Sequence, residues 1–311
     1  MKTNFTNIIK NIKNGNKFAI FIHVNPDADA IGSGQALKLL LESLGKTAYL
    51  CCDDKIPSSL NFLNSNIETD DNLIDSADTY FYLDTSKADR VGKFEKYVNM
   101  KNKTIIVIDH HISQDEFGNE VIRDNTKSST CEMIFDLYQE INAEITPEVA
   151  TLLYSGISSD TGCFLHQNTT SDAHIAAAKL IELGANINLA NLELFSKKPA
   201  IFTQICKYVY KNMKIYGDKL TLVTIKERDY KKLGEPESYL FISSLSHYTT
   251  DILVFITEKS KNNIKINTRS RQANVQELCA KFGGGGHKNA AGADVKDSLK
   301  NVVKKLLKEI L

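Results

Sequence analysis

The chain has 311 residues, of which 42% are hydrophobic and 24% are charged, as in an ordinary globular protein long enough for two domains. Lysine and arginine together number 38, as do aspartate and glutamate, so the formal net charge is zero. A neutral chain has no general attraction for long nucleic acid or for an anionic membrane. A small anionic ligand in a local pocket remains compatible with this composition.

The cysteines and the apolar segments indicate the cell compartment. The six cysteines include no CxxC pair, and the N-terminus does not resemble a signal peptide, so we expect reduced thiols in a cytoplasmic protein. No apolar stretch approaches about 18 residues, so the sequence predicts no membrane-spanning helix.

Apolar runs in the first part of the chain predict a parallel sheet. Helices are predicted over 3–13 and 30–43, the second between the first two strands. Strand–helix–strand order with near-continuous apolar strands is typical of an α/β sheet covered on both faces. The predicted strands are 18–23, 46–51, 80–84 and 103–109.

The second half of the chain predicts a smaller α/β domain. The pattern is helical from residue 128 to about 194, and Lys197-Lys198-Pro199 interrupts it. Strands are then predicted over 220–225, 252–256 and 264–267, followed by a C-terminal helix whose apolar stripe we expect to pack on its own sheet. The predicted parts are a catalytic domain 1–188, a linker helix 189–212 and a substrate-binding domain 213–311.

Acidic and imidazole side chains follow three of the predicted strands directly. His23, Asp27 and Asp29 follow the first strand, Asp84 ends the third, and Asp109-His110-His111 ends the fourth. Ligands of open α/β sheets bind at the carboxyl ends of strands, so we expect these side chains to converge.

A fourth carboxylate completes a predicted metal site. Asp160 lies near the end of the helix that Pro147 opens, where an isolated aspartate is often only a helix cap. Together with Asp27, Asp29 and Asp84 it gives four negative charges, which two divalent cations would neutralise. On extended backbone Asp27 and Asp29 would point the same way, and Gly32-Ser33-Gly34 would allow a tight turn into the next helix.

A glycine run near the C-terminus predicts a phosphate-binding site, with a flexible turn as the alternative. Such runs are tolerated where backbone approaches a ligand closely, and exposed N–H groups beside a helix predicted to begin near Lys288 would bind an anion. The guanidinium group of Arg269 could make a bidentate hydrogen bond to a phosphate. The predicted substrate-binding residues are Arg269, Ser270, Gly284, Gly285, Gly286 and His287.

These motifs resemble those of the DHH phosphoesterase superfamily. Residues 23–33, 83–86, 109–111 and 159–162 are similar to its four motifs, and 282–292 resembles the signature of the DHH-associated domain. The resemblance extends from about residue 17 to 293 and is greatest to the short subgroup that degrades oligoribonucleotides and 3'-phosphoadenosine 5'-phosphate. It implies an active site in the cleft between the two domains.

The resemblance also implies two metals bridged by Asp84. His111 would face the substrate phosphate, with Asp109 behind it. Mixed imidazole and carboxylate ligands favour two Mn(II) ions, with Mg(II) as the alternative, which would clamp an in-line displacement. The implied ligands are His23, Asp27 and Asp84 for one metal and Asp29, Asp84, His110 and Asp160 for the other.

We therefore predict a Mn-dependent phosphoesterase that hydrolyses RNA of about two to five nucleotides to 5'-mononucleotides, since a neutral protein offers long strands no track. It would also dephosphorylate 3'-phosphoadenosine 5'-phosphate to AMP. Hydrolysis of linear or cyclic di-adenosine nucleotides (pApA, cyclic di-AMP) is the first alternative, and a catalytically dead nucleotide-binding regulator is the second. Substrate rank, cleavage polarity, the metal used in the cell and the oligomeric state, a homodimer included, stay open.

Overall fold

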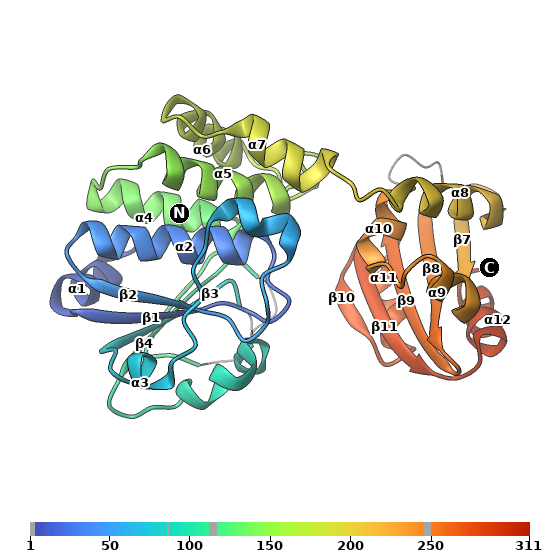
Figure 1. The fold of residues 1–311 in the computed structure, drawn as a ribbon, viewed down its shortest axis with the longest axis horizontal. Helices are drawn as coiled ribbons and strands as arrows, with labels where there is room; N and C mark the ends of the chain where they lie inside the picture. The colour runs from blue at the N-terminus through green and yellow to red at the C-terminus, as the bar shows by residue number, and fades with distance from the viewer. Residues whose placement is uncertain (1–3, 86, 112–116, 246–249) are drawn as a thin grey trace. The chain divides into compact units, whose positions relative to one another are not determined.

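The computed structural model describes residues 4–85, 87–111, 117–245 and 250–311, so Ser86 of the second motif lies outside the described residues. Internal contacts divide the chain into two compact units, Met1–Lys197 and Lys198–Leu311, and each is described by itself (Figure 1). Within the described ranges, no helix is long and apolar enough to cross a membrane.

A five-stranded parallel sheet forms the centre of the N-terminal unit. Its strand order is β2-β1-β3-β4-β5, and all neighbouring strands are parallel. The direction in which successive strands are added to the sheet reverses between β1 and β3, and open α/β sheets bind ligands at such a point. The predicted strands are present, and β5 was not predicted because it is a short edge strand. The strands are β1 (Lys17–Phe21), β2 (Thr47–Cys51), β3 (Thr79–Leu83), β4 (Thr104–Asp109) and β5 (Glu120–Arg123).

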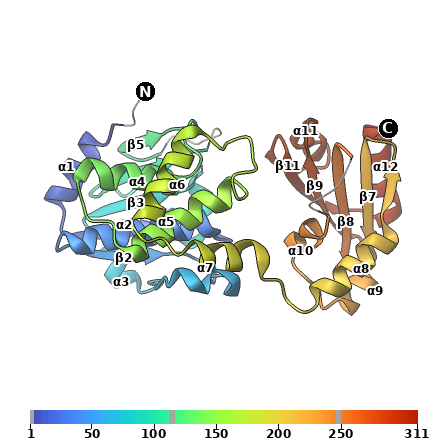
Figure 2. The same cartoon turned by 90° about the horizontal axis from the view of Figure 1, so that it is seen from above.

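Helices cover both faces of this sheet (Figures 1 and 2). Phe18 and Ile20 of β1 pack toward α1, α2, α4 and α5, whereas Ala19 and Phe21 pack toward α3 and η2. This alternation buries both faces, as the near-continuous apolar strands predict. The helical segments are α1 (Thr6–Asn14), α2 (Ala28–Ser43), η1 (Ser58–Leu63), α3 (Asp71–Asp75), η2 (Ala88–Tyr97), α4 (Thr130–Ile141), α5 (Pro147–Asp160), α6 (Ser171–Glu182) and α7 (Ile187–Asn191).

Helix α2 begins earlier than predicted, at Ala28, so the segment predicted as a turn is helical. Asp27 is the N-cap of α2, and its Oδ1 accepts the backbone N–H groups of Asp29 and Ala30, each at 3.0 Å. Asp29 is therefore helical, and the prediction that Asp27 and Asp29 share an extended backbone is wrong. Gly32–Gly34 lie inside α2, where a Cβ on Gly32 would lie 2.7 Å from the carbonyl oxygen of Leu152. The glycine allows close approach of α2 and α5 and does not form a turn.

The segment predicted as one linker helix contains three helical pieces. It includes the end of α7, a π-helical segment η3 (Leu192–Ser196) and α8 (Phe202–Asn212). Lys197–Ile201 separates η3 from α8, and Pro199 in this stretch has no N–H for a helical hydrogen bond.

The C-terminal unit is built on a six-stranded mixed sheet in the order β10-β11-β9-β8-β7-β6. Helices α11 and α12 cover one face and α8, α9 and α10 the other, so the predicted packing of the C-terminal helix on its own sheet is confirmed. The α/β fold is confirmed for both units. The further elements are β6 (Lys214–Tyr216), β7 (Leu220–Ile225), α9 (Glu227–Lys232), α10 (Ser238–Ser243), β8 (Ile252–Ser260), β9 (Asn263–Ser270), α11 (Val275–Ala280), β10 (Gly285–His287), β11 (Ala290–Lys296) and α12 (Leu299–Ile310).

Candidate metal centre

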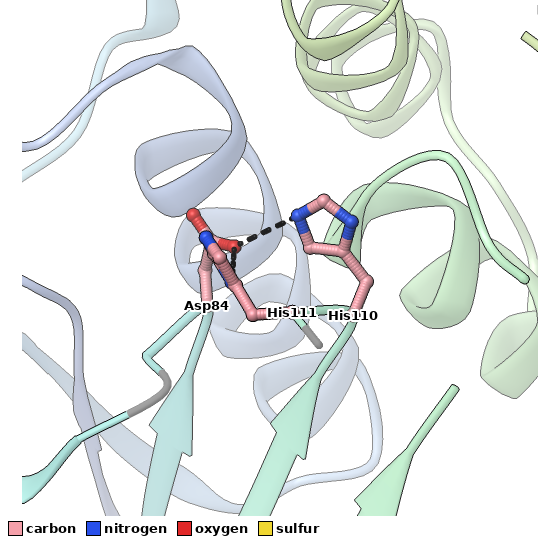
Figure 3. A group of neighbouring side chains, drawn as sticks. All are labelled: Asp84, His110 and His111. Atoms are coloured by element: carbon pink, nitrogen blue, oxygen red, sulfur yellow. Dashed lines mark ion pairs between the residues drawn. The ribbon is translucent and has the colours of Figure 1, made fainter. Parts of the chain in front are cut away.

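Neighbouring strands β3 and β4 bring Asp84, His110 and His111 together at their carboxyl ends. Figure 3 shows both imidazoles directed at the Asp84 carboxylate. Asp84 is buried, and its backbone has a φ of +55°, a left-handed conformation that is uncommon for residues other than glycine. Strained backbone of this kind costs about 1–3 kcal/mol and is concentrated at functional sites.

The two oxygens of Asp84 face different imidazoles. Oδ2 lies 3.4 Å from Nε2 of His23, and Oδ1 lies 3.5 Å from Nε2 of His110. On the His23 side, Oδ2 of Asp27 lies 3.7 Å from the same Nε2. His23, Asp27 and Asp84 thus form one group whose ligand atoms all lie within 4.8 Å of one another.

A second group surrounds His110. Its Nε2 lies 3.2 Å from Oδ2 of Asp160 and 4.0 Å from Oδ2 of Asp29, and the ligand atoms of these three residues lie within 4.8 Å of one another. Among the described residues, Nε2 of His110 is a buried atom that makes no hydrogen bond, although three carboxylates approach it. Asp160 ends α5, where the helix dipole disfavours negative charge. An orphaned imidazole nitrogen among carboxylates fits a bound cation.

The protonation of the site reflects this crowding of carboxylates. Burial lowers the pKa of His23, but the carboxylates of Asp27 and Asp84 outweigh burial and raise it to about 11. Burial likewise lowers the pKa of His110, and the carboxylates of Asp160 and Asp84 raise it to about 12. Burial raises the pKa of Asp160 to about 6. Protons therefore occupy the site when no metal does.

Metal binding should become more stabilising as pH rises. The raised pKa values of His23 and His110 stabilise the metal-free fold fully below the unfolded value of 6.5, and this stability is lost toward about 11 and 12. Metal ligation needs neutral imidazole, so protons compete with the ion. We expect the gain in Tm on adding Mn²⁺ to increase from roughly pH 6 to pH 8, measured by calorimetry. A gain independent of pH would contradict imidazole ligation.

His111 is held by Asp109. Nδ1 of His111 lies 2.7 Å from Oδ1 of Asp109, a fully buried residue, and 3.7 Å from Oδ1 of Asp84. Among the described residues, Asp109 belongs to neither of these two ligand groups. This contact restricts the orientation of the His111 imidazole.

Sequence reasoning missed the contact between α4 and Asp29. Oδ2 of Asp29 accepts the N–H of Thr130 at 2.7 Å, and Oδ1 accepts the N–H of Cys131 at 2.8 Å. The spacing of Ser129 and Glu132 is a signal for this helix start, and Oγ of Ser129 accepts the N–H of Glu132.

In the C-terminal unit, Arg269 and His287 lie on either side of one residue of β11. Ala290 pairs with Arg269 of β9 and with His287 of β10, and directly opposite residues point to the same face of a sheet. The backbone N–H of Ser270 donates to the carbonyl of Asn289 at 3.0 Å. Three of the six predicted substrate-binding residues, Arg269, Ser270 and His287, therefore lie at one end of the sheet.

The second half of the glycine run lies in β10, and the strand β11 rather than a helix follows it, so the prediction of a helix beginning near Lys288 is wrong. Antiparallel pairing of β10 with β11 uses these residues. A Cβ on Gly284 would clash with the carbonyl oxygen of Gly292, and Gly286 has a φ of +136°. Gly285 is exposed, and a Cβ there would meet nothing within 4 Å. Tight strand packing explains Gly284 and Gly286 without a ligand.

The chain matches two domain families. Residues 17–157 match the DHH family N-terminal domain, and residues 241–311 match the DHHA1 domain. It is 28% identical to the bifunctional oligoribonuclease and PAP phosphatase NrnA of Mycoplasma genitalium, covering 100% of this chain and 99% of that one. It is 31% identical to the protein of the same name from Thermus thermophilus, covering 89% and 83%.

A solved structure resembles the whole chain. The exopolyphosphatase-related protein from Bacteroides fragilis superposes with a TM-score of 0.90 at 25% identity, covering 98% of this chain and 94% of that one. The fold and the site define a phosphoesterase that depends on divalent metal ions. The chain belongs to the DHH family, as the motifs predicted.

Proposed function

We propose that this protein hydrolyses short oligoribonucleotides to 5'-mononucleotides and dephosphorylates 3'-phosphoadenosine 5'-phosphate to AMP. The observation that carries the proposal is the placement of Asp84 between two groups of imidazole and carboxylate ligands. The names of the two full-length relatives support the substrate class. A cytoplasmic location accompanies the proposal as a prediction.

Two divalent cations are proposed as cofactors. His23, Asp27 and Asp84 would hold one, and the group around His110 would hold the other, with Asp84 shared. Ligand sets that mix imidazole and carboxylate suit Mn(II) better than Mg(II). Two such ions supply an activated water and neutralise charge on the reacting phosphate.

Side chains of this protein would bind and orient the phosphate. His111, oriented by Asp109, would donate a hydrogen bond to an oxygen of the phosphate that is attacked. Arg269 and His287 of the C-terminal unit would bind phosphate through charge-assisted hydrogen bonds. This division assigns chemistry to the N-terminal unit and substrate binding to the C-terminal unit.

Loss of Arg269 or His287 should weaken substrate capture and leave the metals in place. We expect Arg269→Ala and His287→Ala each to raise KM by the equivalent of about 1.5–3 kcal/mol, with a smaller change in kcat. Lys265→Ala is the matched control on β9, because Lys265 is paired with Asp294 at 2.8 Å. A fall in metal content of the Arg269 or His287 variant, measured by elemental analysis, would contradict this division of roles.

A turnover panel tests the proposed substrates. We expect kcat/KM to peak for RNA of about two to five nucleotides and to fall at least about tenfold by 20 nucleotides at roughly 0.15 M salt, because a chain with no net charge offers little general attraction for extra phosphates. Single-length RNAs, 3'-phosphoadenosine 5'-phosphate, pApA, cyclic di-AMP and polyphosphate should be compared by product chromatography.

Each other outcome of the panel points to a different function. Efficiency that stays level or rises with length would indicate a long nucleic-acid track. Preference for cyclic di-AMP or pApA would favour the di-adenosine alternative, and preference for polyphosphate would favour the activity suggested by the name of the Bacteroides fragilis protein. Tight binding with no turnover in Mn²⁺ would favour a nucleotide-binding regulator.

A further inference from the structure

One buried threonine contacts carboxylates that belong to both candidate metal groups. The N–H of Thr130 donates to Oδ2 of Asp29 at 2.7 Å, and its Oγ1 donates to Oδ1 of Asp84 at 3.1 Å. Thr130 is fully buried at the first position of α4. We infer that Thr130 is a positioning residue that sets how Asp84 is shared between the two metals; the inference rests on the metal site of the proposed function.

The hydroxyl of Thr130 contacts one particular oxygen of Asp84. Oδ1 is the oxygen that lies 3.5 Å from His110, whereas Oδ2 lies 3.4 Å from His23. A hydrogen bond from Oγ1 therefore opposes rotation of the carboxylate and keeps Oδ1 on the His110 side. Charge-assisted hydrogen bonds of this kind are about twice as strong as neutral ones.

The same helix start immobilises Asp29. Both of its oxygens accept backbone N–H groups, from Thr130 and from Cys131, at a helix N-terminus where negative charge is stabilised. The carboxylate of Asp29 is therefore held in place, and Thr130 links the carboxylate of Asp84 to it by hydrogen bonds. Thr130 thus contacts both carboxylates directly.

A third carboxylate residue is tied to the same segment. Nδ2 of Asn168 donates to the carbonyl of Ser128 at 3.0 Å and to the carbonyl of Asp160 at 3.2 Å. The carboxylates of Asp29 and Asp84 thus contact α4 directly, and the backbone of Asp160 is linked through Asn168 to Ser128. Asn168 would position the backbone at Asp160 in the same way.

Titration of metal-free protein with Mn²⁺ tests this assignment. Wild type should bind two ions by calorimetry and by electron paramagnetic resonance, and Thr130→Val should bind one of them about 10–100-fold more weakly, the usual effect of losing a hydrogen bond to a metal ligand. Thr130→Ser keeps the hydroxyl and should restore both affinities. Asn168→Ala should weaken one ion and retain the other.

A control variant and the outcomes that would overturn the inference complete this experiment. Thr221→Val removes the hydroxyl of an equally buried threonine in β7 and should leave both ions bound as in wild type. Equal binding by wild type and Thr130→Val, or no rescue by Thr130→Ser, would overturn the inference. If Thr130→Val does not fold, wild-type Mn²⁺ affinity in Thr130→Ala, which also lacks the hydroxyl, would overturn it. Failure of wild type itself to bind Mn²⁺ would instead overturn the proposed metal site.

Discussion

Asp84→Asn is expected to lower kcat/KM for a dinucleotide by at least about a thousandfold, because a neutral amide is a poor ligand for two cations and the metal-generated nucleophile is lost. Asparagine matches the shape of aspartate and tolerates left-handed backbone, so the φ of +55° should be kept. The fold should therefore survive the loss of activity.

Rates at saturating Mn²⁺, together with the Tm of the metal-free protein, measure this effect. Asp294→Asn is a suitable control, since it neutralises an exposed carboxylate of the C-terminal unit that pairs with Lys265. Retention of more than about a tenth of the wild-type rate by Asp84→Asn would be too much activity for a bridging ligand.

Gly156→Ala should damage the centre through sterics alone. A Cβ on Gly156 of α5 would clash with Sγ of Cys131 and lie 2.7 Å from Oδ1 of Asp29. Because Asp29 is held between α4 and α5, the methyl group must displace the carboxylate or separate the helices. We expect a loss of about 1–3 kcal/mol in the free energy of unfolding, typical of overpacking, and at least about tenfold weaker Mn²⁺ binding.

A second substitution separates the two parts of this effect. Cys131→Ala should relieve the sulfur contact of Gly156→Ala and recover part of the stability measured by denaturant unfolding. Metal binding should stay weak in the double variant, because the contact with Asp29 remains. Wild-type Mn²⁺ affinity in Gly156→Ala would show that Asp29 needs no such space.

The strand ends could be predicted from sequence because their signals are local. Apolar runs before Asp84 and Asp109 predicted both strands, and a parallel sheet then requires those residues to meet at one edge. Two of the wrong predictions concern glycines, because the role of a glycine depends on what packs against it in the fold. Gly32 is explained by Leu152, and Gly286 by the antiparallel pairing of β10 with β11.

The supporting residues could not be predicted because nothing local marks them. Thr130 and Asn168 are ordinary polar residues until α4 and the segment after α5 lie against the carboxylates. The domain ranges and the ligand roles of the site residues stay predictions. The spacing of capping residues in the sequence shows where a helix starts. Which side chains that helix start contacts depends on tertiary packing.

The candidate ligands are spread from His23 to Asp160 in four separate stretches of chain. Several long loops must close before the atoms around Asp84 come within reach of one ion, and closing such loops is a late and entropically costly part of folding. An ion that binds only when all of these ligands are in their folded positions cannot increase the rate of folding. It would instead prolong the lifetime of the native state by slowing unfolding.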